Sequence, residues 1–292
     1  MNTILKATGV IIAGLTLSLL NVKAVRAGTV HNNWYYAFDS LTDSITGNDV
    51  GGTKYEIAGM AYGQQNGQSI FVISTKLPLE GTTSAYADDG IVALGDILIN
   101  STTDSFNVAS EKGNLRAIHL VLNNAAGVSS LGFYENVIAK SVTTANGLAL
   151  ANVGAYHNHV QNNGGTPSMG DLALNTSQID SSQHILNVIA SGDLKGNINL
   201  LDANALQNLG YDSSFIGREG YNTIAVGFDS SLLPDGQFTA LWSPECGNDI
   251  MSLIYGKTTK KVPESSNTLG LLVVGAAGTL IIKNRKKSSV VS

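Results

Sequence analysis

Cysteine is nearly absent from this sequence, since Cys246 is the only one in 292 residues. A single thiol excludes an internal disulfide framework and any metal site built from several thiolates. Charged residues are also scarce, at 13% of the chain, and there are five prolines. Because 43% of the residues are hydrophobic, the chain can bury a core and is not expected to be disordered. The length fits one domain of the all-β kind, for which about 200–250 residues are common.

Positive charge is missing from the middle of the chain. Residues 28–256 contain seven Lys and Arg against 21 Asp and Glu, a net charge of −14. A strongly acidic body has no basic face to neutralise phosphates, so nucleic-acid binding by this region is excluded. The other ten Lys and Arg lie in the two ends of the chain, which are therefore segments of a different kind.

Residues 1–27 have the pattern of a secretory signal peptide. Lys6 precedes an apolar run from Ala7 to Leu20, and Val25-Arg26-Ala27 forms a small-residue cleavage site. The run of about 14 residues is short of the roughly 20 that span a membrane. We therefore expect export with cleavage after Ala27, and a membrane anchor is the alternative. No cysteine lies near this site, which excludes a lipoprotein.

Residues 257–292 contain a linker and a second apolar stretch. As a helix, Leu269–Ile282 would be about 21 Å long, and counted from Ser265 about 27 Å, which is a marginal membrane span. We expect a transmembrane helix at about 266–282 and a basic tail at 283–287. By the positive-inside rule the tail stays in the cytoplasm and Gly28 to Lys261 lie outside. A buried core helix is the alternative.

Three features occur here in a fixed order. They are Val262-Pro263-Glu264, the short Gly-containing apolar stretch, and the cations Lys283, Arg285, Lys286 and Lys287. Together they resemble the PEP-CTERM sorting signal of exosortase-processed bacterial surface proteins. The resemblance covers about the last 30 residues and departs from the family at Ser265, where a second proline is common.

This resemblance implies that an exosortase recognises Pro263-Glu264 and removes or exchanges the helix and its cytoplasmic retention tail. An exosortase is a membrane-embedded enzyme that resembles a cysteine transpeptidase. Independently of the family, Pro263 can start the following helix, and Glu264 would lie at the positive end of its dipole. A permanent anchor is the alternative to a temporary one.

The body reads as short strands separated by Gly, Asn, Asp and Ser. Period-two alternation, as at Phe238, Ala240 and Trp242, predicts half-buried strands, and Asn66-Gly67 predicts a tight turn. We expect strands at 34–39, 55–62, 69–75, 96–99, 116–122, 132–139, 185–190, 223–229, 237–242 and 249–255. The predicted fold class is all-β, an antiparallel, jelly-roll-like β-sandwich over residues 28–256.

Two stretches of the body break the strand pattern. Asp202 as an N-cap and Gly210 beyond the C-terminus predict a short helix from about Ala203 to Leu209. The Gly- and Asn-rich segment from Asn158 to Asp171 is expected to be a long exposed loop.

Four segments of the body resemble a group of cyanobacterial exosortase-dependent surface proteins. They are WYYAFDS at 34–40, YEIAGMAY at 55–62, LLPDG at 232–236 and ECGND at 245–249. This resemblance implies a cellular address and a fold, and it brings no established activity.

Two sets of residues are candidate metal ligands. On a strand, His157 and His159 would share one face and could bind one metal ion, with Asp171 or His119 as a third ligand. Acidic turns offer the oxygen ligands that calcium accepts, although none of these turns has EF-hand spacing. Their residues are Asp39, Asp43, Asn48, Asp49, Asp88 and Asp89. The alternatives are that the histidines are solvated and that the acidic turns bind no ion. We therefore expect no cofactor, and calcium is the candidate ion if one is bound.

Catalytic signatures are incomplete. Cys246 has no histidine close in sequence to act as its base, and a buried small side chain or an intermolecular disulfide are its other interpretations. Ser168 follows its first glycine, Gly165, by three residues, which fails the G-x-S-x-G pattern. A phosphate loop ending at Lys257 would need a glycine where Met251 stands. We therefore expect that the protein is not an enzyme.

The function expected from the sequence is that of a non-enzymatic surface or extracellular-matrix protein. It would be exported, held in the membrane until exosortase processing, and then released or attached to extracellular polysaccharide. One alternative is a carbohydrate-binding or adhesive module, calcium-dependent, that presents Trp34, Tyr35 or Tyr36 on a concave sheet face. A hydrolase using His157 and His159 is another.

Overall fold

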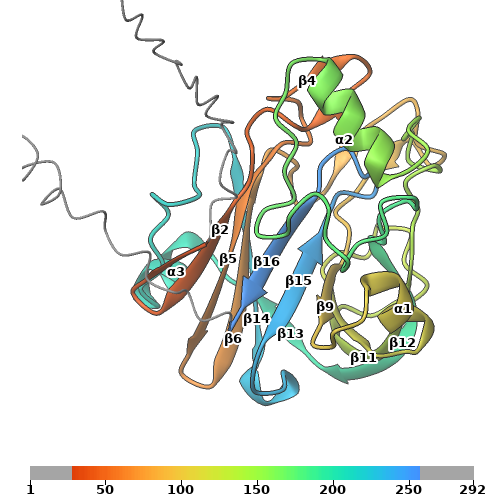
Figure 1. The fold of residues 1–292 in the computed structure, drawn as a ribbon. Coiled ribbons are helices and arrows are strands. Elements are labelled where there is room, and N and C mark those ends of the chain that lie inside the picture. The colour runs from red at the N-terminus through yellow and green to blue at the C-terminus, as the bar shows by residue number, and fades with distance from the viewer. Residues whose placement is uncertain (1–27, 257–292) are drawn as a thin grey trace, which may run out of the picture.

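The computed structural model describes residues 28–256. They form antiparallel strands with a few short helices, which confirms the all-β prediction (Figure 1). Within this range no helix is long and apolar enough to cross a membrane. The predicted signal peptide at 1–27 and the predicted transmembrane helix at 266–282 lie outside the described residues.

The first large sheet has six antiparallel strands in the order β1-β2-β5-β6-β14-β13. Their bounds are Thr29–His31 (β1), Trp34–Phe38 (β2), Ile57–Gln65 (β5), Gln68–Thr75 (β6), Asn222–Asp229 (β14) and Ile198–Leu200 (β13). The predicted turn between β5 and β6 is confirmed, because Asn66 and Gly67 both have positive φ, at 52° and 77°. Two such residues form the hairpin turn whose twist matches that of the strands.

The second large sheet also has six antiparallel strands, in the order β12-β11-β10-β9-β15-β16. Their bounds are Val188–Gly196 (β12), Gly132–Lys140 (β11), Leu115–His119 (β10), Ile97–Asn100 (β9), Phe238–Trp242 (β15) and Met251–Tyr255 (β16). Each of the ten predicted strands overlaps one strand of these two sheets. The strand prediction is therefore confirmed in position, with shifts of a few residues at the ends.

The remaining elements are short. Two two-stranded sheets pair β3 (Ile45–Thr46) with β4 (Asp49–Val50) and β7 (Thr82–Thr83) with β8 (Ile91–Val92). The helices are α1 (Phe106–Glu111), α2 (Val153–Asn162), α3 (Ala203–Asn208) and the 3-10 helix η1 (Ser230–Leu232). Helix α3 confirms the predicted helix, and Asp202 caps it by accepting a hydrogen bond from the Ala205 N–H at 2.8 Å.

The two large sheets share one apolar core. The rings of Phe133 in β11 and Phe228 in β14 stack at 4.9 Å between centroids. Tyr62 in β5 meets Phe238 in β15 edge to face at 5.1 Å. Trp242 is buried in the same cluster, and its indole N–H donates to the Gly95 carbonyl at 3.0 Å. These contacts join residues far apart in the sequence, so the core fixes the two sheets against each other.

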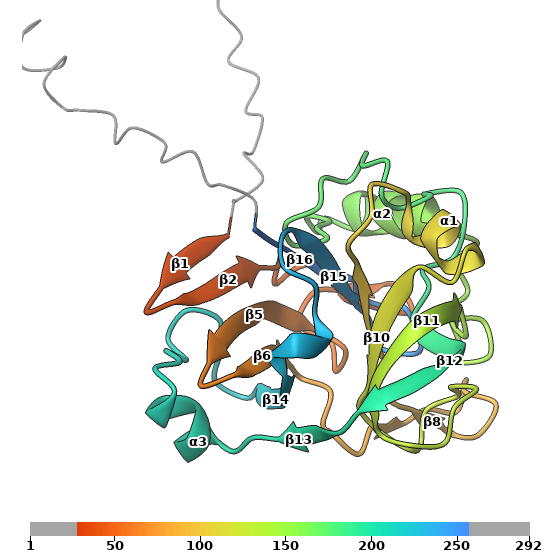
Figure 2. The same cartoon turned by 90° about the horizontal axis from the view of Figure 1, so that it is seen from below.

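The outer faces of the central strands are covered as well, which corrects the expectation of half-buried strands. In β2, Tyr35 belongs to the shared core, whereas Trp34 and Tyr36 pack against α3 and the segment after it. Helices α1 and α2 pack on the outer face of the second sheet. Figure 2 shows α3 on one side of the molecule and α1 with α2 on the other.

Both ends of the described chain lie beside one aromatic ring. The Tyr35 ring fills the space next to Gly28, and it meets the Tyr255 ring edge to face at 6.5 Å. Figure 2 accordingly shows the start of β1 close to the end of β16. We name the place where Gly28, Tyr35 and Tyr255 meet the terminal face.

Candidate functional site

Four acidic side chains gather at one end of the sheets. Asp39 directly follows β2, and Glu56 directly precedes β5, the strand that pairs with β2. Asp249 comes two residues before β16, and Asp43 lies between β2 and β3. Since β2 and β5 are antiparallel, the end of one and the start of the other lie at the same edge. This end of the molecule carries β4 and α2 in Figure 1.

Three of these acids form what we call the carboxylate triad, Asp39, Asp43 and Asp249. One carboxylate oxygen from each lies within 4.8 Å of the others. Asp43 and Asp249 have no solvent exposure, and Asp39 is partly exposed as a residue. Within residues 28–256 none of the three forms an ion pair with a basic side chain. The triad therefore concentrates negative charge without a protein cation to offset it.

Backbone N–H groups hold the triad in place but satisfy only part of it. Both oxygens of Asp249 accept hydrogen bonds, Oδ2 from the Ile57 N–H and Oδ1 from the Ile250 N–H, each at 2.8 Å. Asp43 Oδ2 accepts one from the Ser168 N–H at 2.7 Å. Asp43 Oδ1 and Asp39 Oδ2 are shielded from solvent and have no hydrogen-bond partner. A buried carboxylate oxygen in this state is costly unless something else compensates it.

Glu56 lies next to the triad and, like Asp43, has one hydrogen-bonded oxygen and one oxygen without a partner. Its Oε2 accepts hydrogen bonds from the Ser44 hydroxyl and the Gly52 N–H, whereas its Oε1 is buried and has no partner. The positive charge of Lys76 acts to lower the pKa of Glu56, and the Lys76 ammonium donates to the Gly52 carbonyl at 2.6 Å. A fourth carboxylate thus adds to the negative potential of the triad.

Burial raises the pKa values of all four acids, and repulsion between neighbouring carboxylates adds to this for Asp39, Asp43 and Asp249. Burial is the main cause and raises the pKa of Asp39 from its ordinary 3.8 to about 7, with the charge of Glu56 contributing. The pKa values of Asp43 and Asp249 are held well above the ordinary value, first by burial and then by the neighbouring carboxylates. Such a group either retains protons near neutral pH or binds a cation that replaces them.

Helix α2 reaches this site through Tyr156. The buried Tyr156 hydroxyl lies 2.9 Å from the Asp43 carbonyl, to which it donates, and 3.4 Å from Asp249 Oδ1. The helix corrects the expectation of an exposed loop from Asn158 to Asp171, because it extends to Asn162. Its N-terminus is capped by Asn152, whose side chain accepts from the Ala155 N–H at 2.8 Å.

The histidine pair considered as a candidate metal site is not formed. His157 and His159 lie in α2 and not on a strand, and residues two apart in a helix point about 200° apart around its axis. Neither suggested third ligand joins them, since His119 pairs with Asp96, and Asp171 accepts from the Tyr35 hydroxyl at 2.8 Å. In the described part of the chain, the carboxylate triad is the only group of three or more such ligand residues.

The acidic-turn prediction identified half of the site. Asp39 and Asp43 belong to the triad. Asn48, Asp49, Asp88 and Asp89 are exposed at the surface and lie outside it. Asp249 and Glu56 were missed, because they lie far from Asp39 and Asp43 in the sequence or outside an acidic run. The one signal they share with Asp39 is a place within two residues of a strand end.

A second buried polar group lies beside β9 and β10. His119 Nδ1 and Asp96 Oδ1 are 2.9 Å apart, and the Asn124 amide donates to the same oxygen at 2.9 Å. Asp96 Oδ2 accepts from the Ile189 N–H at 2.7 Å, and His119 Nε2 is buried without a partner. The pair joins β9, β10 and β12, and we assign it a structural role.

Cys246 is a free, buried thiol. Burial raises its pKa to about 12, so it is protonated at neutral pH. A thiol in this state is a poor nucleophile, and it has no access to a second chain without unfolding. Of its three predicted interpretations, the small buried side chain fits the structure.

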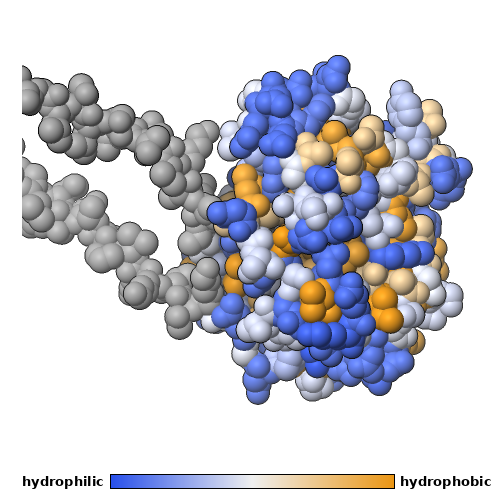
Figure 3. All heavy atoms as spheres, turned by 45° about the vertical axis from the view of Figure 1, so that its right-hand side comes forward, coloured by the Kyte–Doolittle hydropathy of each residue, from blue (hydrophilic) through white to orange (hydrophobic). Residues whose placement is uncertain are grey.

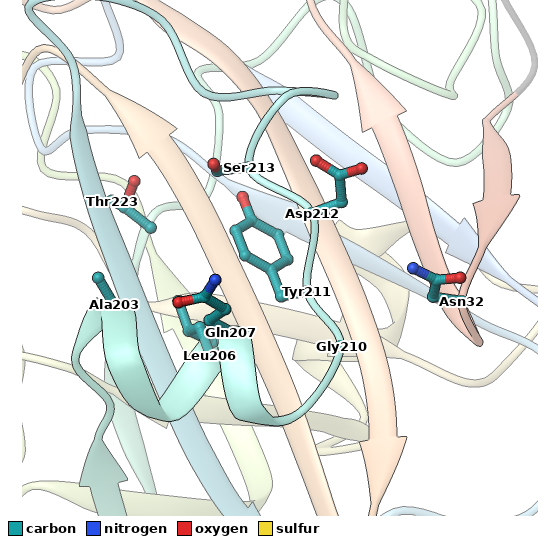
Figure 4. Close-up of a pocket in the computed structure, with 9 residues that line it drawn as sticks. All are labelled: Asn32, Ala203, Leu206, Gln207, Gly210, Tyr211, Asp212, Ser213 and Thr223. Carbon is teal, nitrogen blue, oxygen red and sulfur yellow. The ribbon is translucent and has the colours of Figure 1, made fainter.

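The aromatic residues proposed for a glycan platform are buried. Trp34, Tyr35 and Tyr36 are 0–7% exposed. Tyr35 lies in the core between the two sheets, whereas Tyr211 and Phe215 cover Trp34 and Tyr36 from outside, with the Tyr36 and Phe215 rings stacked at 4.5 Å between centroids. A hollow of about 570 Å³ lies beside this cover. Figure 4 shows Tyr211 there among polar side chains from α3 and the following loop.

The predicted sorting and cleavage residues lie outside the described residues. These are Ala27, Val262, Pro263, Glu264, Lys283, Arg285, Lys286 and Lys287. No protein-family model, curated protein or solved structure matches the chain.

Proposed function

We propose that the chain is a non-enzymatic bacterial surface protein, exported by its N-terminal signal and sorted by an exosortase at Pro263-Glu264. The observation that carries the proposal is the fixed order of Val262-Pro263-Glu264, apolar stretch and basic tail behind an acidic body.

The terminal face adds a geometric argument. Because Gly28 and Tyr255 lie against the same Tyr35 ring, the sequences before and after the body join it at one place. After cleavage behind Ala27 the C-terminal segment alone would hold the body at this point, with the other surfaces of the body free for the outer compartment. Figure 3 shows hydrophilic residues over most of one face, with hydrophobic residues only in small separate groups. Such a face suits an aqueous compartment.

We further propose that the two large sheets form a β-sandwich. Support comes from the single core to which β5, β6 and β14 of one sheet and β9, β15 and β16 of the other contribute. Four consecutive strands, β9 to β12, are also consecutive neighbours in the second sheet, as in a meander. That order differs from the Greek-key crossings of a jelly roll, so we do not extend the proposal to that topology.

The carbohydrate-binding alternative has lost the feature that would favour it. Its expected platform needed exposed aromatic rings, but Trp34 and Tyr36 are packed under Tyr211 and Phe215, and Tyr35 is buried in the core between the sheets. Attachment to extracellular polysaccharide remains part of the proposal only as a fate after processing.

The sorting proposal is tested by changing the processing motif. We compare the intact mass and cell fraction of the wild-type product with those of Pro263→Ala and Glu264→Ala in an exosortase-containing host. The expected result is a shortened product for the wild type and an uncut, membrane-held product for both variants. Ser265→Ala, at the position that departs from the family, is the matched control and should be processed. If all four proteins keep one C-terminus and one location, the proposal is wrong.

A further inference from the structure

The carboxylate triad has the spacing of ligands around one ion. Calcium binds oxygen atoms at about 2.3–2.6 Å, so two ligands on opposite sides of the ion are about 4.6–5.2 Å apart. Oxygens from Asp39, Asp43 and Asp249 all lie within 4.8 Å of one another. Three carboxylates at this separation fit one coordination shell.

The hydrogen bonding of the site leaves oxygens available to an ion. Asp43 has no solvent exposure, and its Oδ1 has neither a donor nor water access. Asp39 Oδ2 is likewise shielded and lacks a hydrogen bond of normal geometry, although the nearby Ser168 hydroxyl and Gly170 N–H act to lower the pKa of Asp39. The other oxygen of each carboxylate accepts a backbone N–H, at 2.7 Å for Asp43 and 3.0 Å for Asp39. The N–H groups thus orient these carboxylates and leave one oxygen of each unpaired. At metal sites, hydrogen bonds to the ligand side chains orient the ligands in the same way.

A bound cation would balance the negative charge of the site. The three triad carboxylates and Glu56 form no ion pair within residues 28–256. Glu56, fully buried, brings a further unpartnered oxygen, Oε1, to the same end of the sheets. Burying several carboxylates together is strongly unfavourable unless they are paired, protonated or bound to a metal.

We propose that Asp39, Asp43 and Asp249 bind one calcium ion. All three ligands are hard oxygen donors, and the triad contains no thiolate or imidazole, which disfavours zinc and copper. Magnesium demands shorter, near-octahedral bonds and retains several waters, which suits a largely buried triad less well than calcium does.

Calcium at this point would join three separate parts of the fold. Asp39 and Asp43 belong to the loop between β2 and β3, and Asp249 precedes β16. The Ser168 N–H and the Tyr156 hydroxyl connect the same site to the segment after α2 and to α2 itself. Since a ligand that binds only the folded state stabilises it, calcium should raise the melting temperature. This proposal does not depend on sorting, because it concerns the folded body alone.

The test is a calcium titration of the full-length chain. The chain is purified in detergent, stripped with EDTA and titrated with CaCl₂ by calorimetry at neutral pH, and its Tm is measured with and without calcium. We expect one calcium per chain and a higher Tm in calcium. Asp43→Asn should weaken binding by at least about tenfold, because outer-shell changes alone cost that much at metal sites. The same variant should lose the calcium-dependent rise in Tm.

Controls make the result decisive. Asp49→Asn removes an exposed acid from β4, close in sequence but outside the triad, and should bind calcium as the wild type does. If Asp43→Asn does not fold by circular dichroism, Asp39→Asn at the partly exposed edge of the site takes its place. Absence of stoichiometric binding up to about 10 mM calcium would mean that the triad holds protons and would overturn the proposal. Unchanged binding by the triad variants, or tighter binding of MgCl₂, would also overturn it.

Discussion

Acid should destabilise the body of this protein through one imidazole, that of His157 in α2. The side chain is 8% exposed, and its Nε2 is buried without a hydrogen-bond partner. Burial lowers the pKa of His157 from its ordinary 6.5 to about 4, because the charged ring is poorly solvated there. The folded protein therefore binds this proton less tightly than the unfolded chain does.

The sign and size of the effect follow from this difference. The stabilisation from a neutral His157 is fully present above about pH 6.5 and is lost as the pH falls toward 4. With pKa values of 6.5 and about 4 in the unfolded and folded states, the free energy of unfolding should fall by about 2 kcal/mol between about pH 7.5 and pH 5. Protonation would loosen α2, and with it the Tyr156 contact to the carboxylate triad.

Urea unfolding of the wild type and of His157→Gln at both pH values measures this term. Glutamine cannot titrate, so the wild type should lose about 2 kcal/mol more than the variant on acidification. Subtracting the variant also removes the contribution of the carboxylates, whose raised pKa values act in the opposite direction. His159→Gln, on the same helix, is the matched control for replacing an imidazole. Equal losses in the wild type and His157→Gln would refute the reasoning.

Three further predictions concern the packing of the body. Gly95→Ala should cost about 1–3 kcal/mol in urea unfolding, because its new Cβ would lie 2.2 Å from the Ser243 carbonyl oxygen; Gly227→Ala, with nothing nearer than 3.5 Å, is the control and should cost less. Trp242→Ala should cost about 3–5 kcal/mol by the same assay, and a loss under 1 kcal/mol would contradict its place in the core. Cys246 should resist thiol reagents until the chain unfolds, and rapid labelling of the native protein would contradict its burial.

The strands could be predicted because their signals are local. Alternating apolar residues and turns such as Asn66-Gly67 specify each strand or hairpin within about ten residues, and all ten predicted strands were found. Helix α2 was missed because its Gly-, Asn- and His-containing sequence has weak helix propensity. The available signal was the spacing of Val153, Tyr156 and Val160, which lie buried on the packed face.

The site and the buried aromatic residues depended on contacts between distant segments. Asp39 and Asp43 drew attention as acidic turn residues, but nothing near Asp249 in the sequence reveals that it meets them across more than 200 residues. Trp34 and Tyr36 read as one exposed face of a strand, and only the folded chain brings Tyr211 and Phe215 over them. Sequence patterns describe a strand and its two faces, whereas tertiary contacts decide what covers each face.

The most direct test of the sorting account is the intact mass of the protein from the surface fraction of the cells that produce it. The account predicts a chain that begins at Gly28 and lacks the 266–282 segment with its basic tail. A full chain of 292 residues, found in the cytoplasm, would contradict it.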